Sequence, residues 1–230
     1  MIKEDEVLEN LDESYKIIQT KDGYKYGIDT VLLSKFFKLN ISKKNNLKII
    51  DIGTGNGILP VLLYKLKNIS EIDGVDIQNA NIERANRALI LNNIKDKITF
   101  IRTDIKEYLK SNYYDIVISN PPYMKVDGKM INENEHKKIS RHEINLNLVD
   151  FIKAAKRLLK PIGKLCFIHR THRLVEIIKE LEANKFCVSK IIFIYSENNT
   201  SSMMYVEALK GKKAKLEVEN YFMIGGKDYK

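Results

Sequence analysis

The sequence lacks the features of a membrane protein, a secreted protein and a zinc protein. It contains no run of about 18 apolar residues, the length that a membrane-spanning helix needs. Residues 1–6 are acidic and are not followed by the apolar segment of a secretory signal. Cysteine occurs only at Cys166 and Cys187, and no pair of cysteine or histidine residues has zinc spacing. We therefore expect a cytoplasmic protein with reduced thiols, no membrane contact and no metal.

The length and charge of the chain suit a small domain with a polyanionic partner. Its 230 residues, 44% of them hydrophobic, are enough for one domain with a small extension. The 39 basic residues outnumber the 30 acidic ones, which gives a net charge of +9. Such an excess favours RNA as a partner. The alternative is a merely solvated surface, because Lys, Asn and Ile are frequent throughout the chain.

Apolar segments with strand-like and helix-like periods alternate along the chain. This alternation predicts an α/β fold with a mostly parallel sheet and helices on both faces. Only residues 196–202 separate the last two strands, which predicts an antiparallel hairpin at one edge. We expect an N-terminal extension of short strands at 1–28 and one domain at 29–230. Its strands are expected at 48–52, 72–76, 98–102, 114–119, 164–168, 187–194 and 203–209, and helices at 30–39, 58–67, 79–92, 104–110, 145–159 and 172–183.

A glycine-rich turn follows the first strand of this domain. Asp51 is followed by Gly53, Gly55 and Gly57, and then by a predicted helix. Glycine permits a tight turn and a close approach of the backbone to a ligand. The spacing is Gly-x-Gly-x-Gly, whereas dinucleotide-binding folds have Gly-x-Gly-x-x-Gly. The leading acidic residue suits a cationic ammonium group better than a pyrophosphate.

Two further acidic residues follow the next two strands. Asp76 ends the second strand, where a carboxylate can accept hydrogen bonds from both hydroxyls of a ribose. Asp104 follows the third strand and could accept from an adenine amino group. With the glycine turn, these residues predict a site for a molecule that has an amino acid end, a ribose and an adenine.

The segment Asn120, Pro121, Pro122 and Tyr123 follows the apolar strand 114–119. Two prolines fix φ and cannot donate backbone hydrogen bonds, so the strand must end there. Open α/β sheets bind ligands at this end of their strands. An Asn side-chain oxygen and a proline carbonyl are acceptors that can hold an NH₂ group, and a tyrosine ring can stack on a base. The alternative is a plain strand-ending turn, and the glycine turn upstream favours the binding site.

The two motifs resemble those of class I S-adenosylmethionine-dependent methyltransferases that act on nitrogen. Three more segments are similar to one bacterial family, which methylates N6 of the adenine beside the anticodon (position 37) of a valine tRNA. They are DGYKYGIDTVLL at 22–33, ISRHE at 139–143 and YVEALKG at 205–211. The resemblance implies a Rossmann-like, mostly parallel seven-stranded sheet with one antiparallel edge strand. It also implies S-adenosyl-L-methionine as cofactor and tRNA as substrate.

The resemblance also implies a role for each motif residue. Asp51 and the glycine turn would lie against the methionine part of the cofactor, Asp76 against its ribose and Asp104 against its adenine. Asn120 would lie beside both cofactor and acceptor. With Pro121 and Pro122 it would hold the acceptor amine, on whose base Tyr123 stacks.

A polar segment, residues 124–141, follows Tyr123 directly. Its basic residues could clamp RNA phosphates at the mouth of the site, and the alternative is a solvated loop. In that second case the RNA-binding face would lie elsewhere, around Lys210, Lys212 and Lys213. His169 follows the strand 164–168 and could touch substrate, although this chemistry needs no general base. The basic residues of the segment are Lys125, Lys129, Lys137, Lys138 and Arg141.

Other acceptors and another class of function remain open at this point. Asn-Pro-Pro-Tyr also occurs in enzymes that methylate adenines of DNA or ribosomal RNA, or a glutamine side-chain amide of release factors. The glutamine enzymes usually carry an N-terminal helical domain and the DNA enzymes a target-recognition domain, and neither is expected in this chain. A non-catalytic RNA-binding scaffold is the third hypothesis, and the intact acids, glycines and Asn120 argue against it. We expect a monomer.

Overall fold

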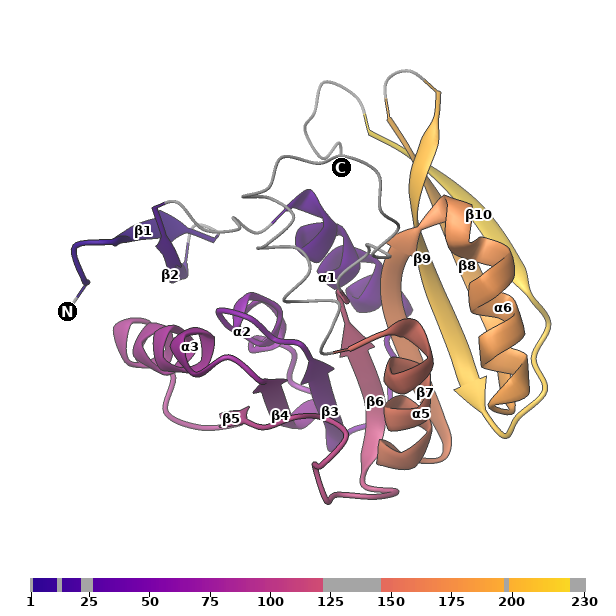
Figure 1. The fold of residues 1–230 in the computed structure, drawn as a ribbon, viewed down its shortest axis with the longest axis horizontal. Coiled ribbons are helices and arrows are strands. Elements are labelled where there is room, and N and C mark those ends of the chain that lie inside the picture. The colour runs from indigo at the N-terminus through magenta and orange to yellow at the C-terminus, as the bar shows by residue number, and fades with distance from the viewer. Residues whose placement is uncertain (1, 12–13, 22–26, 122–145, 197–198, 224–230) are drawn as a thin grey trace.

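The computed structural model describes residues 2–11, 14–21, 27–121, 146–196 and 199–223, which Figure 1 shows as a ribbon. The strands are β1 (Glu6–Asn10), β2 (Lys16–Thr20), β3 (Leu47–Ile52), β4 (Ile69–Asp76), β5 (Ile98–Arg102), β6 (Tyr114–Ser119), β7 (Leu159–Arg170), β8 (Phe186–Tyr195), β9 (Ser201–Lys210) and β10 (Glu217–Phe222). The helices are α1 (Ile28–Asn40), α2 (Ile58–Leu63), α3 (Asn79–Leu91), α5 (Leu148–Leu158) and α6 (Leu174–Ala183).

Eight of these strands form one sheet in the order β10-β8-β9-β7-β6-β3-β4-β5. Neighbouring strands are parallel except for β9, which is antiparallel to both β7 and β8. The predicted α/β class and the mostly parallel sheet with a hairpin of its last two predicted strands are confirmed. Two details of the prediction are wrong: the sheet has eight strands rather than seven, and its antiparallel strand does not lie at the edge.

Burial explains the position of β9. The run Met203–Ala208 is buried at every position, so both faces of this strand are covered. A strand buried on both faces belongs inside a sheet. The added edge strand, β10, is mostly exposed and therefore has no clear apolar pattern. It is fixed to β8 by ladder pairing, by Lys190 contacts to Glu217 and Glu219 at 3.0 and 2.7 Å, and by stacking of its Phe222.

The helices cover the two faces of the sheet, as Figure 1 shows. Side chains of β3 alternate between the faces: Ile49 joins the core beneath α1, α2 and α3, whereas Ile50 and Ile52 join the core beneath α5 and α6. Because both faces are buried, the inner strands read as continuous apolar runs rather than as alternating ones. Among the described residues, no helix has the length and apolar character to cross a membrane.

The predicted helix at 104–110 is absent, and a turn with irregular backbone takes its place. Arg157 of α5 stabilises this irregular backbone. Its guanidinium donates to the backbone carbonyls of Ile105 at 2.6 Å and Lys110 at 3.0 Å, and also to that of Tyr108. These carbonyls are thus bonded to a side chain from a distant part of the sequence and not to helical N–H groups.

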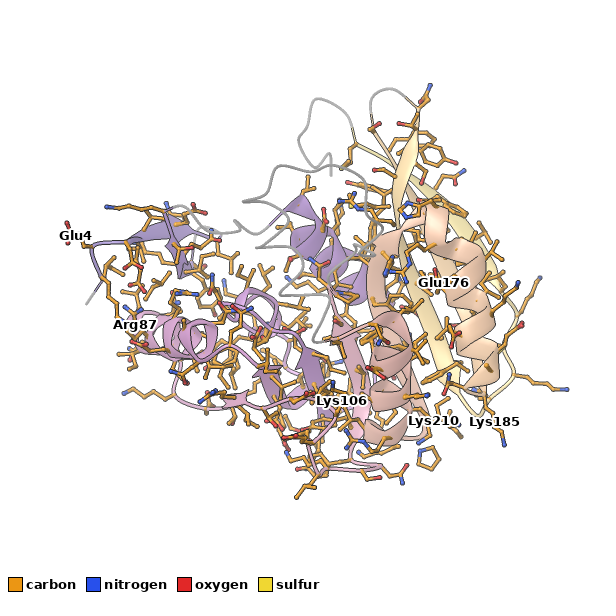
Figure 2. The ribbon with its side chains drawn as sticks, in the orientation of Figure 1. Glu4, Arg87, Lys106, Glu176, Lys185 and Lys210 are labelled. Atoms are coloured by element: carbon orange, nitrogen blue, oxygen red, sulfur yellow. The ribbon has the colours of Figure 1, made fainter. Side chains whose placement is uncertain are left out.

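The N-terminal strands β1 and β2 form a separate antiparallel hairpin that packs on α3. Asn92, just after α3, accepts from the backbone N–H of Lys16 at 2.8 Å. Arg87 of α3, which Figure 2 labels, forms a two-pronged ion pair with the buried carboxylate of Glu6. Short strands were expected here, and the division of the chain after residue 28 stays a prediction.

Candidate active site

The parallel strands bring the predicted cofactor residues to one edge of the sheet. β6, β3, β4 and β5 are neighbours that run in the same direction, so their carboxyl ends lie side by side. Asp51 lies near the end of β3, Asp76 ends β4, and Asp104 and Asn120 follow β5 and β6. The topology therefore collects in one place residues that are up to 69 positions apart in the sequence.

The glycine turn is a sharp reversal fixed by hydrogen bonds to the neighbouring strand. The backbone N–H groups of Gly53 and Thr54 both donate to the carbonyl of Val75 at 2.9 Å. Gly53, Gly55 and Gly57 have φ of 73°, 55° and 78°, in the left-handed region that favours glycine. The observed turn therefore requires the glycine spacing that the sequence shows.

The three glycines face different surroundings. A Cβ atom on Gly57 would lie 2.4 Å from Cζ of Phe100, so this glycine lets the turn pack on the sheet. A Cβ atom on Gly53 or Gly55 would meet no atom within 4 Å. The backbone at Gly53 and Gly55 is thus open on that side, which fits the close approach of a ligand.

Asp76 ties this turn to the next helix. Its carboxylate accepts from the backbone N–H of Gly55 at 3.0 Å and from that of Gln78, just before α3, at 2.7 Å. Asn81 approaches the same carboxylate at 3.4 Å. The side chain is partly exposed. Asp76 therefore organises the turn, and it stands where a ribose could also reach it.

Asp51 is a buried acid behind the turn, with 2% of its surface exposed. Burial raises its pKa to about 7; the Thr54 side chain opposes this, and the negative charge of Asp76 adds to it. The carboxyl group is therefore about half protonated at neutral pH. An ammonium group beside it would favour the charged form, which is consistent with the predicted role of Asp51.

Asp104 lies beside Asp76 at the end of the neighbouring strand. The backbone N–H of Thr103 donates to the carbonyl of Asp76 at 3.1 Å, which holds the two strand ends together. The carboxylate of Asp104 accepts from the backbone N–H of Lys106 at 2.9 Å, and the ammonium of Lys106 lies 3.5 Å from it. Asp104 thus begins the turn that replaces the expected helix.

Asn120 contacts a residue to which sequence reasoning assigned no role. Its side-chain NH₂ group donates to the hydroxyl oxygen of Thr30 at 3.0 Å. Thr30 is a buried residue in the first turn of α1. The preceding residue of β6, Ser119, is fully buried and donates to the carbonyl of Ile52 at 2.7 Å. Two hydrogen bonds thus hold the strand end, and the amide nitrogen of Asn120 is directed toward α1.

Thr30 is the main omission of the sequence analysis. It lies 90 positions before its partner, and a threonine in a predicted helix carries no signal of such a contact. The available signal was the segment 22–33, which contains Thr30 and resembles the start of related enzymes.

His169, at the end of β7, is 1% exposed. Burial, together with the nearby charge of Arg173, lowers its pKa to about 3, so the imidazole is neutral at physiological pH. Its Nδ1 accepts from the backbone N–H of Arg170 at 2.8 Å. These features suit a packed side chain, and contact with substrate stays a prediction. Among the described residues no cluster of His, Cys, Asp or Glu could hold a metal.

Several predicted site residues lie outside the described part of the chain. Pro121 is described and buried. The residues that lie outside are Pro122, Tyr123, Lys125, Lys129, Lys137, Lys138 and Arg141.

Comparison with known proteins gives the context of this site. Residues 27–189 match the sequence family described as Methyltransferase small domain. A tRNA1(Val) (adenine(37)-N6)-methyltransferase from Tolumonas auensis is 26% identical over 208 residues, which cover 90% of this chain and 85% of that protein.

Solved structures share the fold. A protein described as a predicted O-methyltransferase from Agrobacterium tumefaciens superposes with a TM-score of 0.64 at 20% identity, covering 86% of this chain and 88% of that one. The M. jannaschii TYW2 protein in complex with AdoMet gives a TM-score of 0.61 at 15% identity, over 90% of this chain and 86% of that one. At these identities the likeness concerns the fold alone.

Proposed function

Because this chain belongs to the methyltransferase small domain family, we propose that it methylates N6 of an adenine in RNA with S-adenosylmethionine as methyl donor. We further propose that the acceptor is the adenine at position 37 of a valine tRNA. Curated relatives that span most of the chain carry this activity in their names. Within the site, the main support for this proposal is the side-chain amide of Asn120. It lies beside the glycine turn and donates a hydrogen bond to Thr30.

The described residues fit the cofactor. Gly53 and Gly55 leave open space beside their backbone, where the methionine part would lie. Asp51 would face its ammonium group, Asp76 its ribose hydroxyls and Asp104 its adenine amino group. When bound, S-adenosylmethionine supplies an electrophilic methyl group on a sulfonium sulfur.

In this proposal, the protein makes N6 of the target adenine more reactive by accepting hydrogen bonds from it. A target adenine must leave its stack to enter such a site. Its N6 is a weak nucleophile, because the lone pair is delocalised into the ring. The NH₂ group of Asn120 is directed toward Thr30, so its carbonyl oxygen is the group suited to accept an N6 proton, with the Pro121 carbonyl as the second acceptor. These acceptors draw N6 toward tetrahedral geometry and stabilise the positive charge that it gains on methylation. The extra proton is then lost without a dedicated base.

The test is methylation of a defined RNA. Purified protein is incubated with labelled S-adenosylmethionine and total tRNA that lacks the modification, and the labelled nucleoside is mapped. We expect N6-methyladenosine at one position of a valine tRNA. Label in ribosomal RNA, DNA or a release-factor glutamine, supplied in parallel, would reassign the acceptor. Cofactor binding by calorimetry with no transfer to any of these substrates would favour the scaffold hypothesis.

A further inference from the structure

A basic pocket of about 380 Å³ lies at the amino edge of the sheet, opposite the candidate active site. Lys153, Lys156, Arg157 and Lys210 line it, together with Asn112 and Asn184. None of the described residues that line it is acidic. Figure 2 labels Lys185 and Lys210 at this end of the molecule. The active-site chemistry uses none of these residues.

Two of the four cations have structural partners. Arg157 donates to the carbonyls of the loop before β6, and Lys210 donates to the carbonyl of Leu159 at 2.6 Å and to Asn112 at 2.8 Å. Lys153 is exposed and Lys156 is half-buried on α5. The structural contacts therefore explain why Arg157 and Lys210 are present, but they do not explain Lys153 or Lys156.

The helix dipole accounts for only part of this charge. α5 and α6 both end here, and a helix C-terminus carries about half a negative charge, which acts only within the last turn. Lys156 and Arg157 lie in that turn of α5, but Lys153 does not. Partial burial lowers the pKa of Lys210, and the nearby positive charge of Lys156 adds to this effect.

Further lysines lie beside the pocket and form its extension, next to one exposed acid, Glu182. Lys185, Lys212 and Lys213 are exposed, and the N–H of Gly211 donates to the carbonyl of Lys185 at 3.1 Å, which holds these segments together. A single small anion would contact only part of such a row of cations. A chain of phosphates can contact the pocket and its extension together.

We propose that this pocket and its extension bind phosphates of the RNA substrate, far from the adenine that reacts. The inference rests on the proposed function. Asn112 and Asn120 lie at opposite ends of β6, about 26 Å apart at 3.3 Å per residue. Only an extended RNA can place one nucleotide in the active site and phosphates in this pocket, and a folded tRNA is long enough.

The test compares two variants with the same loss of charge. Lys153→Gln/Lys156→Gln changes the pocket and leaves the structural contacts of Arg157 and Lys210 in place. Lys67→Gln/Lys95→Gln changes two exposed lysines in loops next to α2 and α3, on the other face. Binding of the unmodified tRNA is measured at several salt concentrations, and methyl transfer is measured over a range of RNA concentrations up to saturation.

The pocket variant should bind tRNA more weakly and reduce the slope of log K against log salt by about 1.5, because each phosphate contact contributes about 0.7–0.9. Its KM for tRNA should rise, while kcat and cofactor affinity stay unchanged. The control variant should keep the wild-type slope.

If the pocket variant and the control have equal slopes while the wild type methylates tRNA, the inference is wrong and the proposed function stands. If the wild type neither binds nor methylates tRNA, both are wrong. Inorganic phosphate serves as a separate probe. Phosphate binding that the pocket variant loses, with no change in the RNA slope, would identify a small-anion site and overturn the RNA assignment.

Discussion

At the scale of single residues, the orientation of the Asn120 side chain decides which of its groups can meet an acceptor amine. An amide has a donor end and an acceptor end, and a flip would present NH₂ to another NH₂. The hydroxyl of Thr30 accepts from the donor end and so holds the Asn120 side chain against α1, with its oxygen on the opposite side of the amide. Thr30 is thus a positioning residue, since its effect on the reaction passes through Asn120.

Thr30→Val should lower kcat by about tenfold to a hundredfold, which corresponds to the loss of one buried hydrogen bond of about 1–3 kcal/mol. Cofactor affinity should remain near the wild-type value, because Thr30 contacts the acceptor residue. Thr30→Ser keeps the hydroxyl and should restore most of the rate. Asn120→Ala should lose most methyl transfer with nearly intact cofactor binding. Single-turnover kinetics and calorimetry measure both quantities, and a Thr30→Val enzyme with wild-type kcat would refute this role.

Asp51 should make cofactor binding depend on pH. Its folded-state pKa of about 7 lies above the ordinary value of 3.8, so the free protein holds a proton there in this range. Its contribution to folding stability is therefore present below about pH 4 and is lost as the pH rises through 7. An ammonium group that favours the carboxylate should release about half a proton at pH 7.

Calorimetry at pH 7 in buffers of different ionisation enthalpy measures the released proton directly. The affinity for S-adenosylmethionine should also rise between pH 6 and pH 7, where the α-ammonium group of the ligand stays protonated. Asp51→Asn should bind more weakly and should show neither the proton release nor this rise. Equal proton release in the variant and the wild type would exclude Asp51 as the titrating group.

At the scale of elements, the N-terminal hairpin depends on one buried charge. The Arg87 guanidinium holds the pKa of Glu6 at about 2, so its stabilising charge is present above about pH 4.5 and is lost as the pH falls through 2. Glu6→Gln should speed amide exchange in β1 and β2 at least tenfold at pH 7, about 1.4 kcal/mol of local opening free energy. The control is Glu83→Gln, which removes an exposed pair with Lys3 and a longer contact of 4.0 Å with Arg87, and leaves the buried pair of Glu6 and Arg87 in place. Hydrogen exchange that is equal in both variants would show that the ion pair does not anchor the hairpin.

At the scale of the whole molecule, the excess positive charge suggests two separate contacts with RNA. One is the distal basic pocket, and the other is the predicted clamp in residues 124–141. Replacing Lys125, Lys129, Lys137 and Lys138 by Ala should weaken tRNA binding and flatten its salt dependence, with unchanged cofactor affinity. When this variant is combined with the pocket variant, additive losses of binding free energy would show that the two contacts act independently. If the variant with four lysines replaced has the wild-type slope of log K against log salt, these lysines do not contact phosphate. The pocket would then be the main phosphate contact.

The sequence alone determined the class of fold and predicted which strand ends carry the candidate site. Long apolar runs broken by glycine and proline mark buried strands and their ends, because these residues act through their own backbone. Gly53, Gly55 and Gly57 adopt the left-handed turn that their spacing predicts. The order of acids after successive parallel strands was enough to expect Asp51, Asp76 and Asp104 at one edge.

Only the tertiary structure decided the features that depend on contacts between distant residues. Arg157 binds carbonyls of the irregular segment that stands in place of the expected helix at 104–110, and pairing with β8 creates the added strand β10. The contact between Thr30 and Asn120, the raised pKa of Asp51 and the gathering of Lys153, Lys156 and Lys210 arise in the same way. Local sequence specifies backbone preference and burial, whereas the partner of a buried polar group is fixed only when the chain has folded.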